Sequence, residues 1–188
     1  MSSHLDYEIN KELGECYLFM GDYDKAENYY KKAASSNGVH PDPYLGLATI
    51  AVQRGKLEEA LGLYKQAIGI APDDKGYTGA GIVHMEMNAL KDAMDHFEKA
   101  LAHNPSNAIA LNCLVRLGYQ LGCVEKVVPF IEASMQANPE HEQVRITLAG
   151  CLFTIGRHED ARSQLESALE INPASVEAKE LFDHIAAA

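Results

Sequence analysis

The strongest constraint on this chain is a pattern of small and aromatic residues that recurs every 33 to 34 positions. The pattern is Ala, an aromatic residue four positions later, and a second Ala after three more. It starts at Ala26, Ala60 and Ala93. The copy that starts at Val127 has lost most of the pattern, and the copy that starts at Ala161 has Leu in the aromatic position. Successive starts lie 34, 33, 34 and 34 residues apart. A fixed period of this length indicates a repeat architecture, in which units bury their apolar faces by stacking on one another.

Two further markers divide each unit into a pair of helices. A residue that tolerates positive φ lies shortly before each start, at Gly21, Gly55, Asn88, Gly122 and Gly156. Proline follows each pattern except the first, where Gly38 takes its place, at Pro72, Pro105, Pro139 and Pro173. Apolar residues between the markers recur at helical spacing, as in Leu13, Tyr17 and Met20. The sequence therefore predicts that each unit forms a helix, a tight turn and a second helix that ends before a proline.

These units resemble tetratricopeptide repeats. The family pattern has a bulky–small pair at positions 7 and 8, Gly at 15, Ala at 20, an aromatic residue at 24, Ala at 27 and Pro at 32. The second unit matches it with Leu47, Ala48, Gly55, Ala60, Tyr64, Ala67 and Pro72. In-phase units run over 7–40, 41–73, 74–107, 108–141 and 142–175, and the fourth departs most from the pattern. The resemblance covers about nine-tenths of the chain and implies an all-α, right-handed α-solenoid superhelix that forms a single domain over 1–188.

The two ends of the chain differ in how they are expected to finish the stack. Residues 176–186 carry one apolar stripe at helical spacing, which is typical of a capping helix over the last exposed face, and the stripe consists of Ala178, Leu181, Phe182 and Ile185. The N-terminal end offers no comparable cap. We expect the first helix, with Leu5 and Ile9, either to fray or to meet a partner.

Composition narrows the classes of function. The 188 residues include 27 acidic and 16 Lys or Arg residues, a net charge of −11 that disfavours binding to nucleic acid. No apolar run reaches the roughly 18 residues of a membrane span and no leader pattern is present, so a cytoplasmic protein is expected. The four cysteines, at positions 16, 113, 123 and 151, form no CxxC motif and are expected to be reduced, mostly packed thiols.

Motifs for catalysis or cofactor binding are weak. The glycine-rich stretch from Gly76 to Gly81 follows no strand and lacks the Gly-Lys-Ser/Thr sequence of a phosphate loop. His84, His96 and His103 fit no known metal-ligand spacing, and packed or surface histidines are the favoured interpretation, with metal binding left open. No sequence motif of a nucleophilic hydrolase is present. We therefore expect a non-enzymatic protein without a cofactor.

The resemblance also implies a binding groove. In tetratricopeptide superhelices, the first helix of each pair lines the concave face through positions 2, 5, 9 and 12. The candidate groove residues carried over in this way are Lys11, Leu18, Leu45, Thr49, Val52, Thr78, Ile82, Met85, Asn112, Arg116, Tyr119, Ile146 and Phe153. The lining is largely apolar from Leu45 to Phe153, as in a peptide-binding site, although packing between helices is the alternative role for some members.

One subtype of the family, the dicarboxylate clamp for chaperone C-termini, is not expected here. Lys11 and Lys75 match the clamp, but Glu15, Gly46 and Gly79 occupy its other positions, and a carboxylate at Glu15 would repel the captured group. We expect side-chain pockets to dominate, with Asn112 and Arg116 as polar contacts.

The sequence thus favours a scaffold that binds a peptide segment of a partner protein and assembles or localises a complex. Two alternatives remain open. One is a structural module that forms homo-oligomers or coats a larger assembly, and the other is the regulatory arm of a larger enzyme system.

Overall fold

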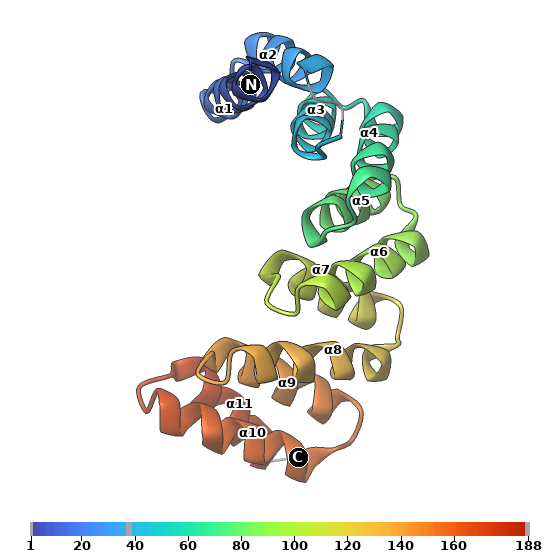
Figure 1. Ribbon diagram of the computed structural model, residues 1–188. Coiled ribbons are helices and arrows are strands. Elements are labelled where there is room, and N and C mark those ends of the chain that lie inside the picture. The colour runs from blue at the N-terminus through green and yellow to red at the C-terminus, as the bar shows by residue number, and fades with distance from the viewer. Residues whose placement is uncertain (1, 37–38, 187–188) are drawn as a thin grey trace. The chain divides into compact units, whose positions relative to one another are not determined.

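The computed structural model describes residues 2–36 and 39–186, so Gly38 lies outside the described residues. Over the described ranges the chain forms eleven α-helices and no strand (Figure 1). The helices are α1 (Ser2–Phe19), α2 (Tyr23–Ser36), α3 (Asp42–Gln53), α4 (Leu57–Ile70), α5 (Asp74–Glu86), α6 (Leu90–His103), α7 (Ala108–Gln120), α8 (Val124–Ala137), α9 (Glu142–Thr154), α10 (His158–Ile171) and α11 (Val176–Ala186). The expectation of an all-α fold is confirmed.

The helices belong to two compact units, Met1–His103 with α1 to α6 and Asn104–Ala188 with α7 to α11. In the first unit α1 packs on α2, α3 on α4 and α5 on α6, and in the second α7 packs on α8 and α9 on α10. The last helix, α11, contacts α9 and α10 and buries Ala178 and Ile185. Five helix pairs and one further helix fit the five repeats and capping helix expected from the sequence. A single domain over the whole chain stays a prediction.

Each helix pair is joined by a turn that contains one residue in the left-handed region. Their φ angles are 75° at Gly21, 70° at Gly55, 58° at Asn88, 67° at Gly122 and 81° at Gly156. After Gly21, the Asp22 N–H donates to the Tyr17 carbonyl at 2.9 Å, which satisfies a carbonyl at the end of α1. The positive-φ turns expected at these five positions are therefore present.

The recurring small–aromatic–small pattern forms the core of each pair. In α2, Ala26 and Ala33 are fully buried and Tyr30 is 3% exposed. The small residues let two helices approach closely, and the ring fills the space beside them. The corresponding residues of the later helices are also buried: Ala60, Tyr64, Ala67, Ala93, Phe97, Ala100, Val127, Ile131, Ser134, Ala161, Leu165 and Ala168.

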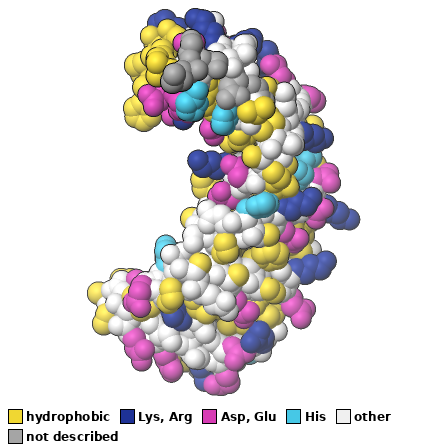
Figure 2. Space-filling model, viewed as in Figure 1, with side chains coloured by type: hydrophobic (Ala, Val, Ile, Leu, Met, Phe, Trp, Pro, Cys, Tyr) yellow, Lys and Arg dark blue, Asp and Glu magenta, His cyan; other side chains and the backbone are white. Residues whose placement is uncertain are grey.

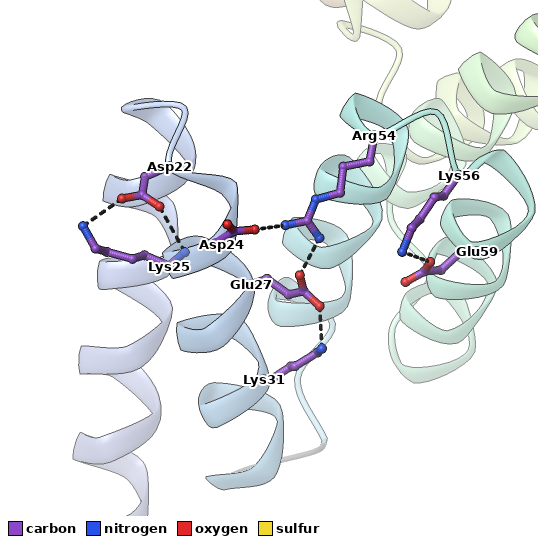
Figure 3. A network of polar contacts seen from close by, with 8 residues as sticks. All are labelled: Asp22, Asp24, Lys25, Glu27, Lys31, Arg54, Lys56 and Glu59. Atoms are coloured by element: carbon purple, nitrogen blue, oxygen red, sulfur yellow. Dashed lines mark hydrogen bonds and ion pairs between the residues drawn. The ribbon is translucent and has the colours of Figure 1, made fainter.

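A cluster of ion pairs links α2 to the end of α3 (Figure 3). The Arg54 guanidinium lies 2.5 Å from an Asp24 oxygen and also bonds Glu27, which pairs with Lys31 on its own helix. The bonds from Lys31 and Arg54 lower the pKa of Glu27 to about 2. The cluster holds the second helix of one repeat to the first helix of the next.

Candidate functional site

A hollow of about 270 Å³ opens among the first five helices of the first unit. Most of its lining comes from α1, α3 and α5, the first helices of their pairs. The residues that line this first-unit hollow are Glu15 and Leu18 of α1, Tyr30 of α2, Asp42, Leu45, Gly46 and Thr49 of α3, Tyr64 of α4 and Lys75 of α5. The hollow thus brings together three of the candidate groove residues, Leu18, Leu45 and Thr49.

Two tyrosine rings from second helices contribute aromatic surface to the hollow. The ring of Tyr30 packs so closely on Gly46 that a Cβ there would collide with it, and Tyr64 meets Gly79 in the same way. Burial, followed by the nearby carboxylates, raises the pKa of Tyr30 to about 12, so its hydroxyl stays neutral at physiological pH. Neither tyrosine is among the groove residues expected from the sequence. Gly46 and Gly79, at position 6 of the second and third repeats, indicate this arrangement in the sequence, because only a glycine leaves room for the ring.

Three charged side chains surround the apolar part of the hollow: Glu15, Asp42 and Lys75. The hydroxyl of Tyr7 donates to an Asp42 oxygen at 3.2 Å, and burial followed by the Asp42 charge raises the pKa of that phenol. Two carboxylates and one ammonium line the hollow, and the Lys11 ammonium beside it is paired with the Glu8 carboxylate, so a local excess of negative charge remains. Lys11, another candidate, lies 3.0 Å from Glu8 in an i, i+3 ion pair and does not line the hollow.

The other candidates of the first unit occupy different environments. Val52 packs partly against the buried cluster around Tyr64, while Ile82 and Met85 are half-buried on α5. Thr78 is only 6% exposed. A ligand outside the folded unit cannot reach a buried threonine, so we leave Thr78 out of the proposed binding surface.

The second unit presents its candidates mainly on α7. Asn112, Arg116 and Tyr119 are exposed at spacing i, i+4 and i+7, on one face of that helix. Asn112 and Gln143 of α9 both line a pocket of about 90 Å³. The hydroxyl of Thr154 donates to the Tyr119 oxygen at 3.3 Å. The second unit therefore offers a row of polar and aromatic side chains.

Two second-unit candidates are engaged in packing. Ile146 is 3% exposed. The ring of half-buried Phe153 makes edge contacts with His158 at 4.9 Å and His184 at 5.5 Å between ring centres. We leave Ile146 out of the proposed surface, and Phe153 presents only part of its ring to a ligand.

The glycine-rich stretch of α5 is explained by helix packing. A Cβ at Gly76 would collide with Ile68, one at Gly79 with Tyr64 and one at Gly81 with Phe97. Each glycine therefore admits a side chain from α4 or α6 into the face of α5.

The histidines of α5 and α6 lie close together but do not form a recognisable metal centre. The rings of His84 and His96 lie 4.8 Å apart between centres, and Tyr77 stacks on His103 at 5.4 Å. Across the part of the chain that the structure describes, no group of three or more His, Cys, Asp or Glu side chains is placed to hold a metal ion. Within the same part, none of the helices combines the length and apolar character needed to cross a membrane.

Comparison with known proteins identifies the family. Two models described as tetratricopeptide repeat match residues 11–75 and 124–182. The chain therefore belongs to the tetratricopeptide repeat family, and the expected fold class of helix-turn-helix repeats is confirmed. Proteins of this family generally mediate protein–protein interactions, and their fold is typically non-catalytic.

Relatives with curated descriptions are longer proteins. DnaJ homolog subfamily C member 7 of Homo sapiens is 25% identical over 186 residues, covering 91% of this chain and 37% of that protein. Protein O-mannosyl-transferase TMTC1 of Homo sapiens is 26% identical over 181 residues, covering 92% of this chain and 20% of that protein. The chain thus spans well under half the length of each.

Solved structures with the same fold show lower identity. PilF of Pseudomonas aeruginosa aligns with a TM-score of 0.72 and 16% identity, covering 100% of this chain and 86% of that one. YrrB, described as a TPR protein with an unusual peptide-binding site, aligns with a TM-score of 0.64 and 16% identity, covering 91% of this chain and 89% of that one. At this identity the likeness defines the fold.

Proposed function

We propose that this protein is a non-enzymatic scaffold that binds a peptide segment of a partner protein in the first-unit hollow and so assembles or localises a complex. The observation that carries the proposal is the hollow itself, where Leu18 and Leu45 lie beside two tyrosine rings and three charged groups. A recess in which apolar side chains lie beside a few converging polar groups is a common form of ligand site. We further propose a cytoplasmic location, in keeping with the four free cysteines and the net charge of −11.

The lining specifies the chemistry of the bound segment. An apolar side chain of the peptide fits over Leu18 and Leu45, where it removes apolar surface from water. A basic residue is favoured beside Glu15 and Asp42, because these carboxylates outnumber the nearby Lys75 ammonium. The preferred ligand is therefore a segment that combines an apolar anchor with a neighbouring Lys or Arg.

Asn112, Arg116 and Tyr119, which lie on one face of α7 in the second unit, provide a further contact surface for the same class of ligand. The Asn112 amide carries both a donor and an acceptor for a peptide backbone, and the Arg116 guanidinium suits a carboxylate. Tyr119 adds exposed aromatic surface. YrrB, which shares the fold and is described as having an unusual peptide-binding site, supports peptide binding as the general activity.

A peptide-library selection tests the hollow. Peptides selected on the intact chain are titrated against three variants by fluorescence anisotropy: Leu45→Lys, Lys75→Glu and, as a control at an exposed leucine in the second unit, Leu121→Lys. The proposal expects Leu45→Lys to weaken binding at least about tenfold, the effect of losing about 1.4 kcal/mol. It expects Lys75→Glu to shift binding toward the more basic of the selected peptides and Leu121→Lys to change nothing.

Far-UV circular dichroism of each variant separates loss of binding from loss of folding. Leu45 also packs against the buried cluster around Tyr64, so its replacement can affect folding as well as binding. Lys75 is exposed, and Lys75→Glu therefore tests the hollow without changing that packing. Unchanged affinity and unchanged peptide preference in both folded hollow variants would exclude the hollow as the binding site.

A further inference from the structure

One face of α1 is apolar and uncovered by any described element. Leu5, Ile9, Glu12, Cys16 and Phe19 follow one another at alternating spacings of four and three, which places them on one side of the helix. Leu5 is 61% exposed, Ile9 48% and Phe19 94%, and Glu12 and Cys16 are exposed between them. Figure 2 shows hydrophobic side chains gathered at the α1 end of the first unit, with acidic side chains close by. We refer to these five residues as the α1 face.

The corresponding positions of later repeats are buried. Ile9 corresponds to Pro43 of α3, Gly76 of α5 and Val144 of α9, and Cys16 corresponds to Ile50, Val83 and Cys151. All six of these residues are buried. The α1 face therefore occupies the part of the repeat that is normally inside the protein.

In the later repeats, the second helix of the preceding repeat covers these positions. Ile50 of α3 belongs to one buried cluster with Ala26 and Tyr30 of α2. Val83 of α5 packs in the same way with Ala60 and Tyr64 of α4. A helix is thus the element that this face of a repeat accommodates, and its spacing suits a helix lying along α1.

Glu12 distinguishes the α1 face from its counterparts. The same repeat position holds Gly46 in α3 and Gly79 in α5, and each glycine receives a tyrosine ring from the covering helix. A carboxylate on α1 leaves no room for such a ring and, once covered, needs a cationic partner. A helix that covers α1 therefore carries Lys or Arg where the other covering helices carry Tyr.

Charge also argues against a second copy of this chain as the covering element. An antiparallel copy of α1 would bring its own Glu12 near the first, because Glu12 lies in the middle of the face. The exposed side of α11 carries Glu177, Glu180 and Asp183 against the single cation Lys179, so it too would meet Glu12 with an excess of like charge. Complementarity instead favours a different protein with a basic residue at the centre of an apolar helix face.

We propose that the α1 face is a docking site for an amphipathic helix of a partner protein that places a Lys or Arg opposite Glu12. The site is separate from the first-unit hollow, since none of its five residues lines that hollow. It gives the scaffold a second binding site, which a partner helix can occupy whether or not the hollow holds a peptide.

Two matched peptides test this proposal on the intact chain. Both carry the sequence of residues 57–70, the helix that covers α5, and are held helical by a side-chain staple because isolated helices of this length are marginal in water. One carries Tyr64→Arg and the other Tyr64→Glu, at the position that faces Gly79, the counterpart of Glu12. Affinities are measured by fluorescence anisotropy at low and at high salt.

The Arg peptide is expected to bind at least about tenfold more tightly than the Glu peptide, with a preference that shrinks as salt is raised. Glu12→Arg reverses the preference, and Ile9→Asp abolishes binding of both peptides. The Arg peptide also slows alkylation of the exposed Cys16 thiol, measured by mass spectrometry, while the rate at Cys123 in the second unit stays unchanged. Leu121→Lys, at an exposed leucine of the second unit, leaves all of these results as they are.

Equal binding of the two peptides, or an unchanged alkylation rate at Cys16, overturns the proposal. Sedimentation velocity compares the oligomeric state of the unchanged chain with that of the Ile9→Asp variant. A dimer that Ile9→Asp dissociates would assign the α1 face to a second copy of the chain and would likewise overturn it.

Discussion

The ring of Tyr30 in α2 lies directly over Gly46 in α3, with no space between them for even a methyl group. This contact joins consecutive repeats and at the same time forms part of the first-unit hollow. Tyr64 and Gly79 repeat the relationship between α4 and α5. The repeat spacing and the candidate site therefore depend on the same pairs of residues.

Gly46→Ala is expected to destabilise the first unit by about 1–3 kcal/mol, the usual cost of overpacking a core. Gly62→Ala is the matched control, because Gly62 is exposed in α4 with nothing within 4 Å of a Cβ there. That change is expected to stabilise by about 0.5–1 kcal/mol through helix propensity. Urea unfolding measures both variants, and a neutral or stabilising Gly46→Ala would show that the ring contact is not tight.

The Arg54 cluster is expected to contribute stability that depends on pH and salt. Because the folded pKa of Glu27 is about 2, below its ordinary 4.5, the contribution is present above pH 4.5 and is lost as pH falls toward 2. Glu27→Gln should lower the unfolding midpoint at pH 7 and flatten its acid dependence. Glu59→Gln, which removes a more exposed pair with Lys56, should have a smaller effect. Equal effects of the two changes in thermal melts would contradict this ranking.

His84 is expected to make the first unit sensitive to mild acid. Burial of the ring, then the neighbouring His96, lowers the pKa of His84, with Lys65 acting in the same direction and Asp92 opposing it. The unfolded chain then binds more protons than the folded one, so stability falls as pH drops below the ordinary value of about 6.5. His84→Gln should reduce the loss of thermal stability between pH 7.5 and 5.5. An unchanged pH profile in His84→Gln would refute the assignment.

Pro129 is expected to weaken the second helix of the fourth repeat. It lies inside α8, where proline lacks the N–H that would complete the helical hydrogen bond. Because its side chain is exposed, Pro129→Ala should stabilise the second unit by up to about 3 kcal/mol. Chemical denaturation followed by circular dichroism measures the gain. A loss of stability would mean that the proline fits a local distortion which alanine cannot adopt.

The glycine, asparagine and proline markers were sufficient to predict the helix pairs and the five left-handed turns, and the apolar stripe of residues 176–186 was sufficient to predict the final helix, because these features depend on local residue types. The accessibility of the candidate residues was less predictable. Leu45 and Thr78 occupy the same position in consecutive repeats, yet Leu45 lines the hollow and Thr78 is buried. The difference depends on the side chains that neighbouring helices place beside each residue. Likewise, proline usually ends a helix, whereas α8 continues through Pro129.

The central claim is that the first-unit hollow receives a peptide, and methyl NMR tests it most directly. A peptide selected on the intact chain is added to protein with labelled leucine methyl groups. We expect intermolecular NOEs from the apolar anchor of the peptide to Leu18 and Leu45, with the exposed control Leu121 unchanged. Saturating binding that leaves the Leu18 and Leu45 methyl signals unperturbed would contradict the account.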